Sequence, residues 1–519
     1  MRRPHLHSGV SILLLALALG LALRAPGWFS DDEKRRFLLF EPDEIQHVDI
    51  AFDLYQQLSG DSLDHYFTPI FNVRGYGGLS GQLLYFRHLI DGGTPDVSGT
   101  ILLNRVLSTF FSLLLIWVVY LIGRRVGFKE STAGLAALLL ACCDLNCTYA
   151  HYGIPAMGYV LGLYLTILGL VSWEKNNRDK SAFFFLVLGT AMAFGFKFDF
   201  LALFVVGGYL LYKVITTLSS QKREPLLALI LGLPVFLVLV GSLTAFSWSP
   251  LEMLDSWREL QRQNQDVIAQ DNHWLTNPIV YAFATVAGFG ALVSFAASTA
   301  ILRIPEVLRK ASPAIFACGV LLALECLLRW SIDTPFVRRA NFLMPILALV
   351  AAYGIERAKW KSWQVVVLVI YTLGFALAGQ SNHWFDSRSK ARDWLATEIP
   401  ATSILAATPY APARDSRPYV NFKINGDWEY ALLHESYYAR YWRSMTTPFG
   451  PPKCCEEVYH CQGEKMCNGL QAILSGQRQD IELVARFTTH RFFPERWLYH
   501  RILGPYDTFY GDALVYRKK

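Results

Sequence analysis

Two adjacent carboxylates, Asp43 and Glu44, stand in the stretch FLLFEPDEIQHVDIAFDLY, about twenty residues beyond the first apolar block. Pro42 predicts the first turn of a helix, because its missing N–H costs nothing there. The helix dipole favours the two negative charges in that turn, and His47 falls on the same face as Asp43. Acidic residues commonly begin helices, but an acidic pair at a membrane surface also performs chemistry or binds a cation.

Four basic residues are the natural partners of an anionic ligand. Arg329, Arg338 and Arg339 lie in LLRWSIDTPFVRRANFLMP, and Lys197 lies in FGFKFDF. Guanidinium groups suit phosphate, since their planar donors match its oxygens. The competing interpretation is that these side chains extend towards the membrane surface or pair with Asp333.

The elements that position these residues are apolar blocks. Of the 519 residues 53% are apolar and 17% are charged, whereas about 25% of a soluble protein is charged. Bunched apolar residues indicate a polytopic α-helical membrane protein. Eleven transmembrane helices are predicted, at 9–23, 101–122, 131–148, 153–172, 182–196, 199–217, 226–247, 276–300, 313–329, 342–355 and 364–379.

Basic residues cluster in alternate loops, which predicts the sidedness of the chain. If all eleven spans are real, these loops share the side of the N-terminus, in the cytoplasm, and the first span is a retained signal anchor or a cleaved signal peptide. The outer segments are then 25–100, 248–275 and everything after 380. We therefore expect a transmembrane module over 1–379 and an extracytoplasmic α/β domain over 380–519. A net charge of +6 without a continuous basic face argues against nucleic acid.

Four cysteines form a polar cluster, CCEEVYHCQGEKMC, in the predicted outer domain. They are Cys454, Cys455, Cys461 and Cys467. In an oxidising compartment they would make two disulfides, with three possible pairings. Four thiolates also suffice for zinc, although this spacing is not that of a standard zinc ribbon. We favour disulfides and leave zinc as the alternative.

The apolar positions after the acidic pair form a stripe that we expect to lie along the membrane surface. It consists of Ile45, Val48, Ala51, Phe52 and Tyr55. The resulting site faces outward, with carboxylates on one side and guanidinium groups on the other. A carboxylate would take the proton of an acceptor hydroxyl, and the arginines would stabilise a departing phosphate.

The order of these features resembles the GT-C glycosyltransferases, in the branch of protein O-mannosyltransferases and aminoarabinose lipid A transferases. EPDEIQHVDIAFDLYQQLSGD resembles the Asp-Glu motif with its surface helix, and YAHYGIPAMGYVLGLYL resembles a second outer site. AFGFKFDFLALF resembles the Gly-x-Lys-Tyr stretch, FVRRANFLMPILALVAAYGIE the Arg-Tyr-Leu-x-Pro element, and SRSKARDWLATEIPATSILA the start of the C-terminal domain. The resemblance runs nearly end to end, and the order of the motifs is more specific than any one of them.

The resemblance implies a role for each matching residue. Asp43 would be the catalytic base and Glu44 its neighbour in binding or orientation. Arg338 or Arg339 would contact the phosphate of a polyprenyl-phosphate sugar, and Lys197 is a further candidate for that contact. Transfer would invert the anomeric centre without a covalent intermediate.

This chain also departs from the family pattern. The segment after His151 carries no carboxylate, Asp144 lies earlier, and the Arg-Tyr of the late element is Arg339-Ala340 here. A divalent metal is therefore an open question, with Glu44, His47 and His151 as candidate ligands.

The acceptor is also open: a protein hydroxyl, a lipid or a glycan. The competing function is a transporter or flippase of a lipid-linked anion, although no paired halves with broken helices are recognisable. A scaffold that keeps the fold without activity is a third interpretation. The sequence carries no clear ER retention signal, which favours the prokaryotic plasma membrane, with the C-terminal domain outside, over an ER membrane.

Overall fold

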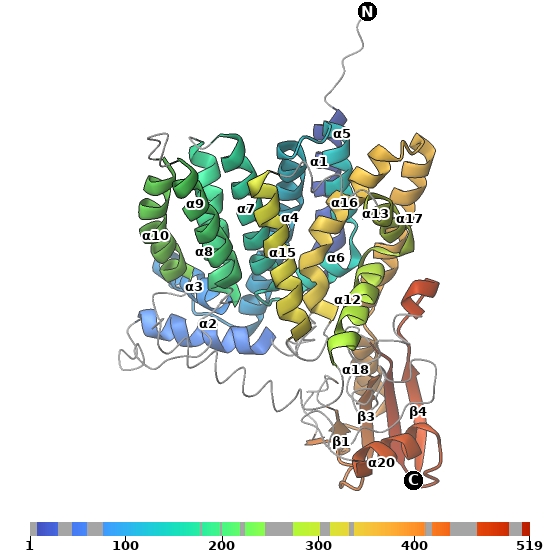
Figure 1. Cartoon of the computed structure of the whole chain (residues 1–519). Coiled ribbons are helices and arrows are strands. Elements are labelled where there is room, and N and C mark those ends of the chain that lie inside the picture. Colours follow the sequence, from blue (N-terminus) through green and yellow to red (C-terminus); the bar gives the residue numbers. More distant parts are fainter. Residues whose placement is uncertain are drawn as a thin grey trace, which may run out of the picture.

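A bundle of apolar helices makes up most of the chain (Figure 1). The computed structural model describes residues 8–29, 44–59, 76–176, 179–197, 200–217, 224–243, 273–301, 312–331, 337–408, 411, 418–435, 464–497 and 511–519. The bundle consists of α1 (Ser8–Arg24), α4 (Val97–Arg125), α5 (Glu130–Ala141), α6 (Asp144–His151), α7 (Ala156–Lys175), α8 (Lys180–Lys197), α9 (Phe200–Thr217), α10 (Glu224–Leu243), α12 (His273–Phe289), α13 (Ala291–Ile301), α15 (Pro313–Ser331), α16 (Met344–Arg357) and α17 (Ser362–Trp384).

Each predicted span coincides with one of these helices or with a bent pair of them. Within the described residues, five helices are long and apolar enough to cross a membrane, or seven if each bent pair counts as one span. The membrane character of the chain is therefore confirmed, whereas the number of eleven spans and their sidedness remain predictions.

The block 276–300, predicted as one continuous span, is broken. Helices α12 and α13 meet at an angle of 115°. Gly290 sits at the break with φ +81°, a left-handed conformation that disfavours any residue with a side chain. A Cβ atom there would lie 2.5 Å from the hydroxyl of Tyr371. That hydroxyl accepts a 3.0 Å hydrogen bond from the Ala291 N–H, a backbone donor at the start of α13.

Helices α7 and α8 pack backbone to backbone because both carry small residues at the contact. A Cβ atom on Gly162 would lie 2.5 Å from the Ala193 nitrogen, and one on Gly189 would lie 2.4 Å from the Thr166 nitrogen. This close approach fixes the end of α8 against α7, and with it the position of Lys197.

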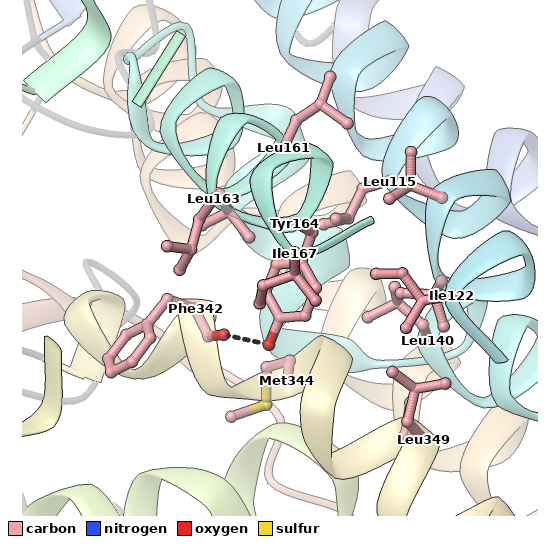
Figure 2. Close-up of a cluster of buried hydrophobic side chains, with 14 of the residues drawn as sticks. Leu115, Ile122, Leu140, Leu161, Leu163, Tyr164, Ile167, Phe342, Met344 and Leu349 are labelled. Atoms are coloured by element: carbon pink, nitrogen blue, oxygen red, sulfur yellow. Dashed lines mark hydrogen bonds between the residues drawn. The ribbon is translucent and has the colours of Figure 1, made fainter. Parts of the chain in front are cut away.

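A buried cluster joins α4, α5, α7 and α16 (Figure 2). Tyr164 of α7 donates a 2.9 Å hydrogen bond to the Phe342 carbonyl and accepts one of 2.9 Å from the Ile346 N–H. These bonds satisfy backbone groups where the 3-10 helix η4 (Val337–Leu343) passes into α16. The cluster therefore holds η4, which carries Arg338 and Arg339, against the core.

Two further helices, α2 (Glu44–Ser59) and α3 (Tyr76–Asp91), lie at one end of the bundle. The orientation of α2 along the membrane surface remains a prediction, but part of its apolar stripe is covered by protein. Val48 and Ala51 are fully buried and Tyr55 is buried, and the last two pack against Leu84 of α3. Helix α3 therefore covers this part of the stripe, whereas Phe52 is only half-buried.

The C-terminal region, at the same end of the bundle as α2, is an α/β unit (Figure 1). The unit consists of α18 (Ser387–Glu398), β1 (Leu405–Ala407), β2 (Tyr419–Asn421), β3 (Tyr430–His434), α20 (Glu464–Leu474), β4 (Ile481–Phe487) and β5 (Ala513–Lys518). One further short helix, η1 (Ala25–Phe29), directly follows α1 near the N-terminus. The strand order is β2-β1-β3-β5-β4. Strand β1 pairs in parallel with β2 and β3, and β5 pairs antiparallel with β3 and β4.

Candidate active site

Glu44, the first residue of α2, is anchored inside the bundle. Both of its carboxylate oxygens accept 3.0 Å hydrogen bonds from the guanidinium group of Arg105 on α4. Oε1 also accepts a 2.8 Å hydrogen bond from the Gly153 N–H. The two side chains are 1% and 0% exposed. A two-point pair of this geometry is strong and directional, so it fixes the N-terminus of α2 against α4.

Gly153 is required where it stands. A Cβ atom on this residue would lie 2.8 Å from the Asn104 Cβ and 3.3 Å from Glu44 Oε1. The absence of a side chain lets the backbone N–H reach the carboxylate. Asn104 is itself 1% exposed, and its amide makes no hydrogen bond to any residue that the structure describes.

Helix α6, which leads to Gly153, is held at both ends by a polar network. Gln380 of α17 is 2.8 Å from His151 Nε2 through its amide oxygen, and its amide nitrogen donates to Asp144 Oδ1 at 2.9 Å. Asp144 also forms a 2.7 Å ion pair with Arg496 of the C-terminal region. Asp144, to which the family resemblance gave no role, therefore anchors the start of α6.

His47 lies about one turn after Glu44 on α2, and the charges of Glu44 and Lys197 both affect its pKa. Burial lowers the pKa of His47 to about 4; the negative charge of Glu44 opposes this shift and the positive charge of Lys197 adds to it. The imidazole of His47 is therefore neutral at physiological pH.

Two cations face the same aromatic ring beside this position. Lys197 Nζ is 5.3 Å from the ring centre of Tyr159, and the Arg329 guanidinium carbon is 5.1 Å from it. Arg329 also donates to the Tyr159 hydroxyl at 2.8 Å. That hydroxyl donates to Glu325 at 2.6 Å, and Arg329 pairs with the same carboxylate oxygen at 3.1 Å. The charges of Lys197, Arg329 and Glu325 sum to +1, and the Lys197 side chain is exposed.

The remaining predicted site residues lie partly outside the described structure. Asp43 immediately precedes the first described residue of α2 and is not described. Arg338 and Arg339 are in η4, whose backbone alone is described at these positions. Cys467, in α20, is disulfide-bonded. The other cysteines of the cluster, Cys454, Cys455 and Cys461, lie outside the described residues, so their pairing stays a prediction.

Sequence reasoning missed Arg105 and Glu325, which fall within predicted spans 101–122 and 313–329. A signal was present, because a charged residue inside an apolar span is costly and usually functional. It also missed Tyr159, whose aromatic type is too common in such spans to stand out. Within the described residues, no three His, Cys, Asp or Glu side chains gather as a metal-binding group.

Comparisons with known proteins agree with this architecture. The family model of dolichyl-phosphate-mannose-protein mannosyltransferases matches residues 98–240. Two structures of the oligosaccharyltransferase of Archaeoglobus fulgidus, one tethered to an acceptor peptide and one in the apo form, superpose with TM-scores of 0.50 and 0.52. Each is 11% identical and covers 99% of this chain and 89% of that chain. The chain has the GT-C fold, and residues 98–240 match the mannosyltransferase family model.

The matched region, residues 98–240, contains Asn104, Arg105, Gly153, Tyr159 and Lys197. Most of the site described above therefore lies within the part of the chain that matches the family. ArnT from Cupriavidus metallidurans, bound to undecaprenyl phosphate, is a further similar structure with 12% identity and a TM-score of 0.49, covering 82% of this chain and 92% of that chain. No curated protein matches the sequence.

Proposed function

We propose that this protein is an integral membrane glycosyltransferase that moves a sugar from a polyprenyl-phosphate donor to a hydroxyl group of a protein, lipid or glycan acceptor. Transfer would take place on the outer face of the membrane, which we infer to be the prokaryotic plasma membrane. The observation that carries the proposal is the anchoring of Glu44 by Arg105 and Gly153. It fixes the start of α2, directly after Asp43, at the bundle end where Lys197 also acts on His47.

In this proposal each charged group has a separate task. Glu44 is too fully bonded to serve as a base and acts as the anchor of the motif. Its neighbour Asp43 is the base. Lys197 and Arg329 bind the donor phosphate together with Arg338 and Arg339 of η4. Lys197 and Arg329 carry one positive charge more than their partner Glu325 balances.

The reaction is a single displacement. The Asp43 carboxylate takes the proton of the acceptor hydroxyl while its oxygen forms a bond to the anomeric carbon. The bond from that carbon to the phosphate oxygen breaks at the same time, and the electron pair leaves with the polyprenyl phosphate. The basic side chains that bind the phosphate stabilise the charge that develops on it as it leaves. One displacement inverts the anomeric centre.

Reconstituted protein supplied with radiolabelled polyprenyl-phosphate sugars and candidate acceptors tests this function. Asp43→Asn should lower kcat by at least about 100-fold, the usual contribution of a positioned base. Asp49→Asn, an exposed carboxylate on the same helix, is the control and should be fully active. Equal turnover in both variants would remove the assigned base. Movement of the labelled lipid across vesicles without sugar transfer would favour a transporter instead, and runs with and without EDTA decide the metal requirement.

A further inference from the structure

Residues 490–497, which follow strand β4, leave the C-terminal sheet and run along α17. At the start of this segment, the side-chain amide of Asn382 makes two hydrogen bonds with the backbone of His490. It donates to the His490 carbonyl at 3.0 Å and accepts from the His490 N–H at 3.1 Å. Near its end, Glu495 accepts a hydrogen bond from the Tyr371 hydroxyl. Phe493 packs edge-on against Tyr371 and Phe375, with ring centres 5.8 and 5.2 Å apart.

The register of these contacts gives the depth that the segment reaches. From Asn382 to Tyr371 is eleven residues of continuous helix, or about 16 Å at about 1.5 Å per residue. Half of a bilayer's hydrocarbon core is about 15 Å. Tyr371 lies well inside α17, which is part of a segment that is long and apolar enough to span a membrane. The segment therefore extends from the outer end of α17 to near its middle, and Figure 1 shows the short helical turn after β4 rising towards the bundle.

The polarity of the segment is inverted relative to a water-exposed loop. Phe492 and Trp497 are 68% and 59% exposed. The charged residues between them turn inwards: Arg496 is 16% exposed, pairs with Asp144, and lies 4.4 Å from the Phe375 ring centre. Exposed aromatic groups with charges facing the protein are expected where the surroundings are lipid.

The neighbouring surface of α17 continues this pattern. Val366, Val367 and Ile370 are 54%, 50% and 65% exposed, on the helix that the segment contacts. We infer that residues 490–497 form a re-entrant element, which dips from the outer domain into the outer leaflet beside α17 and presents Phe492 and Trp497 to acyl chains. The occupant of this apolar surface is bilayer lipid, and the inference stands independently of the transferase activity.

Spin labels in proteoliposomes of phosphatidylcholine test this placement. Phe492→Cys and Trp497→Cys carry the label, Ile370→Cys is the lipid-facing control, and Leu483→Cys, a 49% exposed position on strand β4, is the water-facing control. The unsubstituted protein, labelled in parallel, measures the background from native cysteines. All four labelled positions are exposed, so the substitutions should not disturb packing.

Collision rates with oxygen, which concentrates in lipid, and with a nickel chelate, which stays in water, are then compared. The oxygen-to-nickel ratio at 497 should match that at Ile370, and the ratio at 492 should be lower than at 497. Both ratios should exceed that at Leu483 several-fold. A ratio equal to that at Leu483 would overturn the inference, as would exclusion of both reagents, which would indicate contact with another protein. Tryptophan fluorescence gives a second readout. Brominated lipid should quench the emission of the unsubstituted protein more than that of Trp497→Phe, because the emission of Trp497 is missing in the variant.

Discussion

Glu44 and Arg105 are 61 positions apart in the sequence, yet both carboxylate oxygens of Glu44 accept 3.0 Å hydrogen bonds from the Arg105 guanidinium group. The pair is buried, so each charge depends on the other for solvation. The consequence is that an ion pair and a backbone N–H hold the start of α2, the helix directly after Asp43, against the region that matches the family model.

Arg105→Met should lower the free energy of unfolding by about 3–5 kcal/mol, because it leaves a buried carboxylate without its partner. The double variant Glu44→Gln/Arg105→Met removes both charges and should regain much of that stability, but not the activity, since α2 loses its anchor. Thermal unfolding in detergent and the transfer assay measure the two effects. An Arg105→Met protein that unfolds at the wild-type temperature would contradict the energetic importance of the pair.

Gly153→Ala should reduce transfer without a change of charge. The added methyl group would lie 2.8 Å from the Asn104 Cβ and 3.3 Å from Glu44 Oε1, so the anchor must shift. Gly207→Ala, on α9, is the matched control, because a Cβ there meets nothing within 4 Å. The control should be as active as wild type and slightly more stable, since alanine favours helix over glycine. Equal activity in both variants would argue against a steric requirement at Gly153.

Asn104→Leu should raise the free energy of unfolding by about 1–3 kcal/mol, the cost of burying an unsatisfied polar group. Asn341→Leu is the contrasting substitution. Asn341 is also buried, but its oxygen accepts a 3.3 Å hydrogen bond from Asn146, so its loss should destabilise the protein. Chemical denaturation of the two variants shows whether the signs differ. A destabilised Asn104→Leu protein would mean that the amide is satisfied in the native state.

Protonation of His47 should destabilise the protein as the pH falls. Its folded pKa of about 4 lies below the ordinary value of 6.5, so between these values the unfolded chain binds the extra proton. The stability from His47 is therefore present above pH 6.5 and is lost towards pH 4, by up to about 1.4 kcal/mol per pH unit. His47→Gln should flatten the dependence of the unfolding temperature on pH between 6.5 and 5. Parallel curves for both proteins would refute this assignment.

Lys197→Ala should raise the donor KM by about 10- to 100-fold, the equivalent of one charge-assisted hydrogen bond of about 1.5–3 kcal/mol. Lys213→Ala serves as the control, since Lys213 pairs with Glu174 at 2.9 Å near the far end of α9. Its donor KM should stay at the wild-type value. Donor titration of the two variants distinguishes phosphate binding from a general loss of positive charge.

The helices were predictable because hydrophobicity is a local property, and each apolar block became a helix or a bent pair. The start of α2 beside the acidic pair was predictable from its helix-start residues. The partners of the charged residues were not predictable. Arg105 pairs with Glu44, which is 61 positions away in the sequence, and Arg496 of the C-terminal region pairs with Asp144 of α6. Such pairs depend on tertiary geometry, which a single sequence does not encode locally. The start of α13 at the Gly290 break is likewise contacted by Tyr371, which is 80 positions from its partner Ala291.

The position of β5 in the sheet has a consequence for biosynthesis. Residues 513–518 insert between β3 and β4, which do not pair with each other. During translation, β4 therefore has no partner among the described strands until β5 has been synthesised. The helical bundle is complete before that moment, so the C-terminal sheet closes beside a bundle that has already been synthesised. Reconstituted chains truncated before residue 513 should have a C-terminal region that is sensitive to protease and a bundle that is protected by lipid.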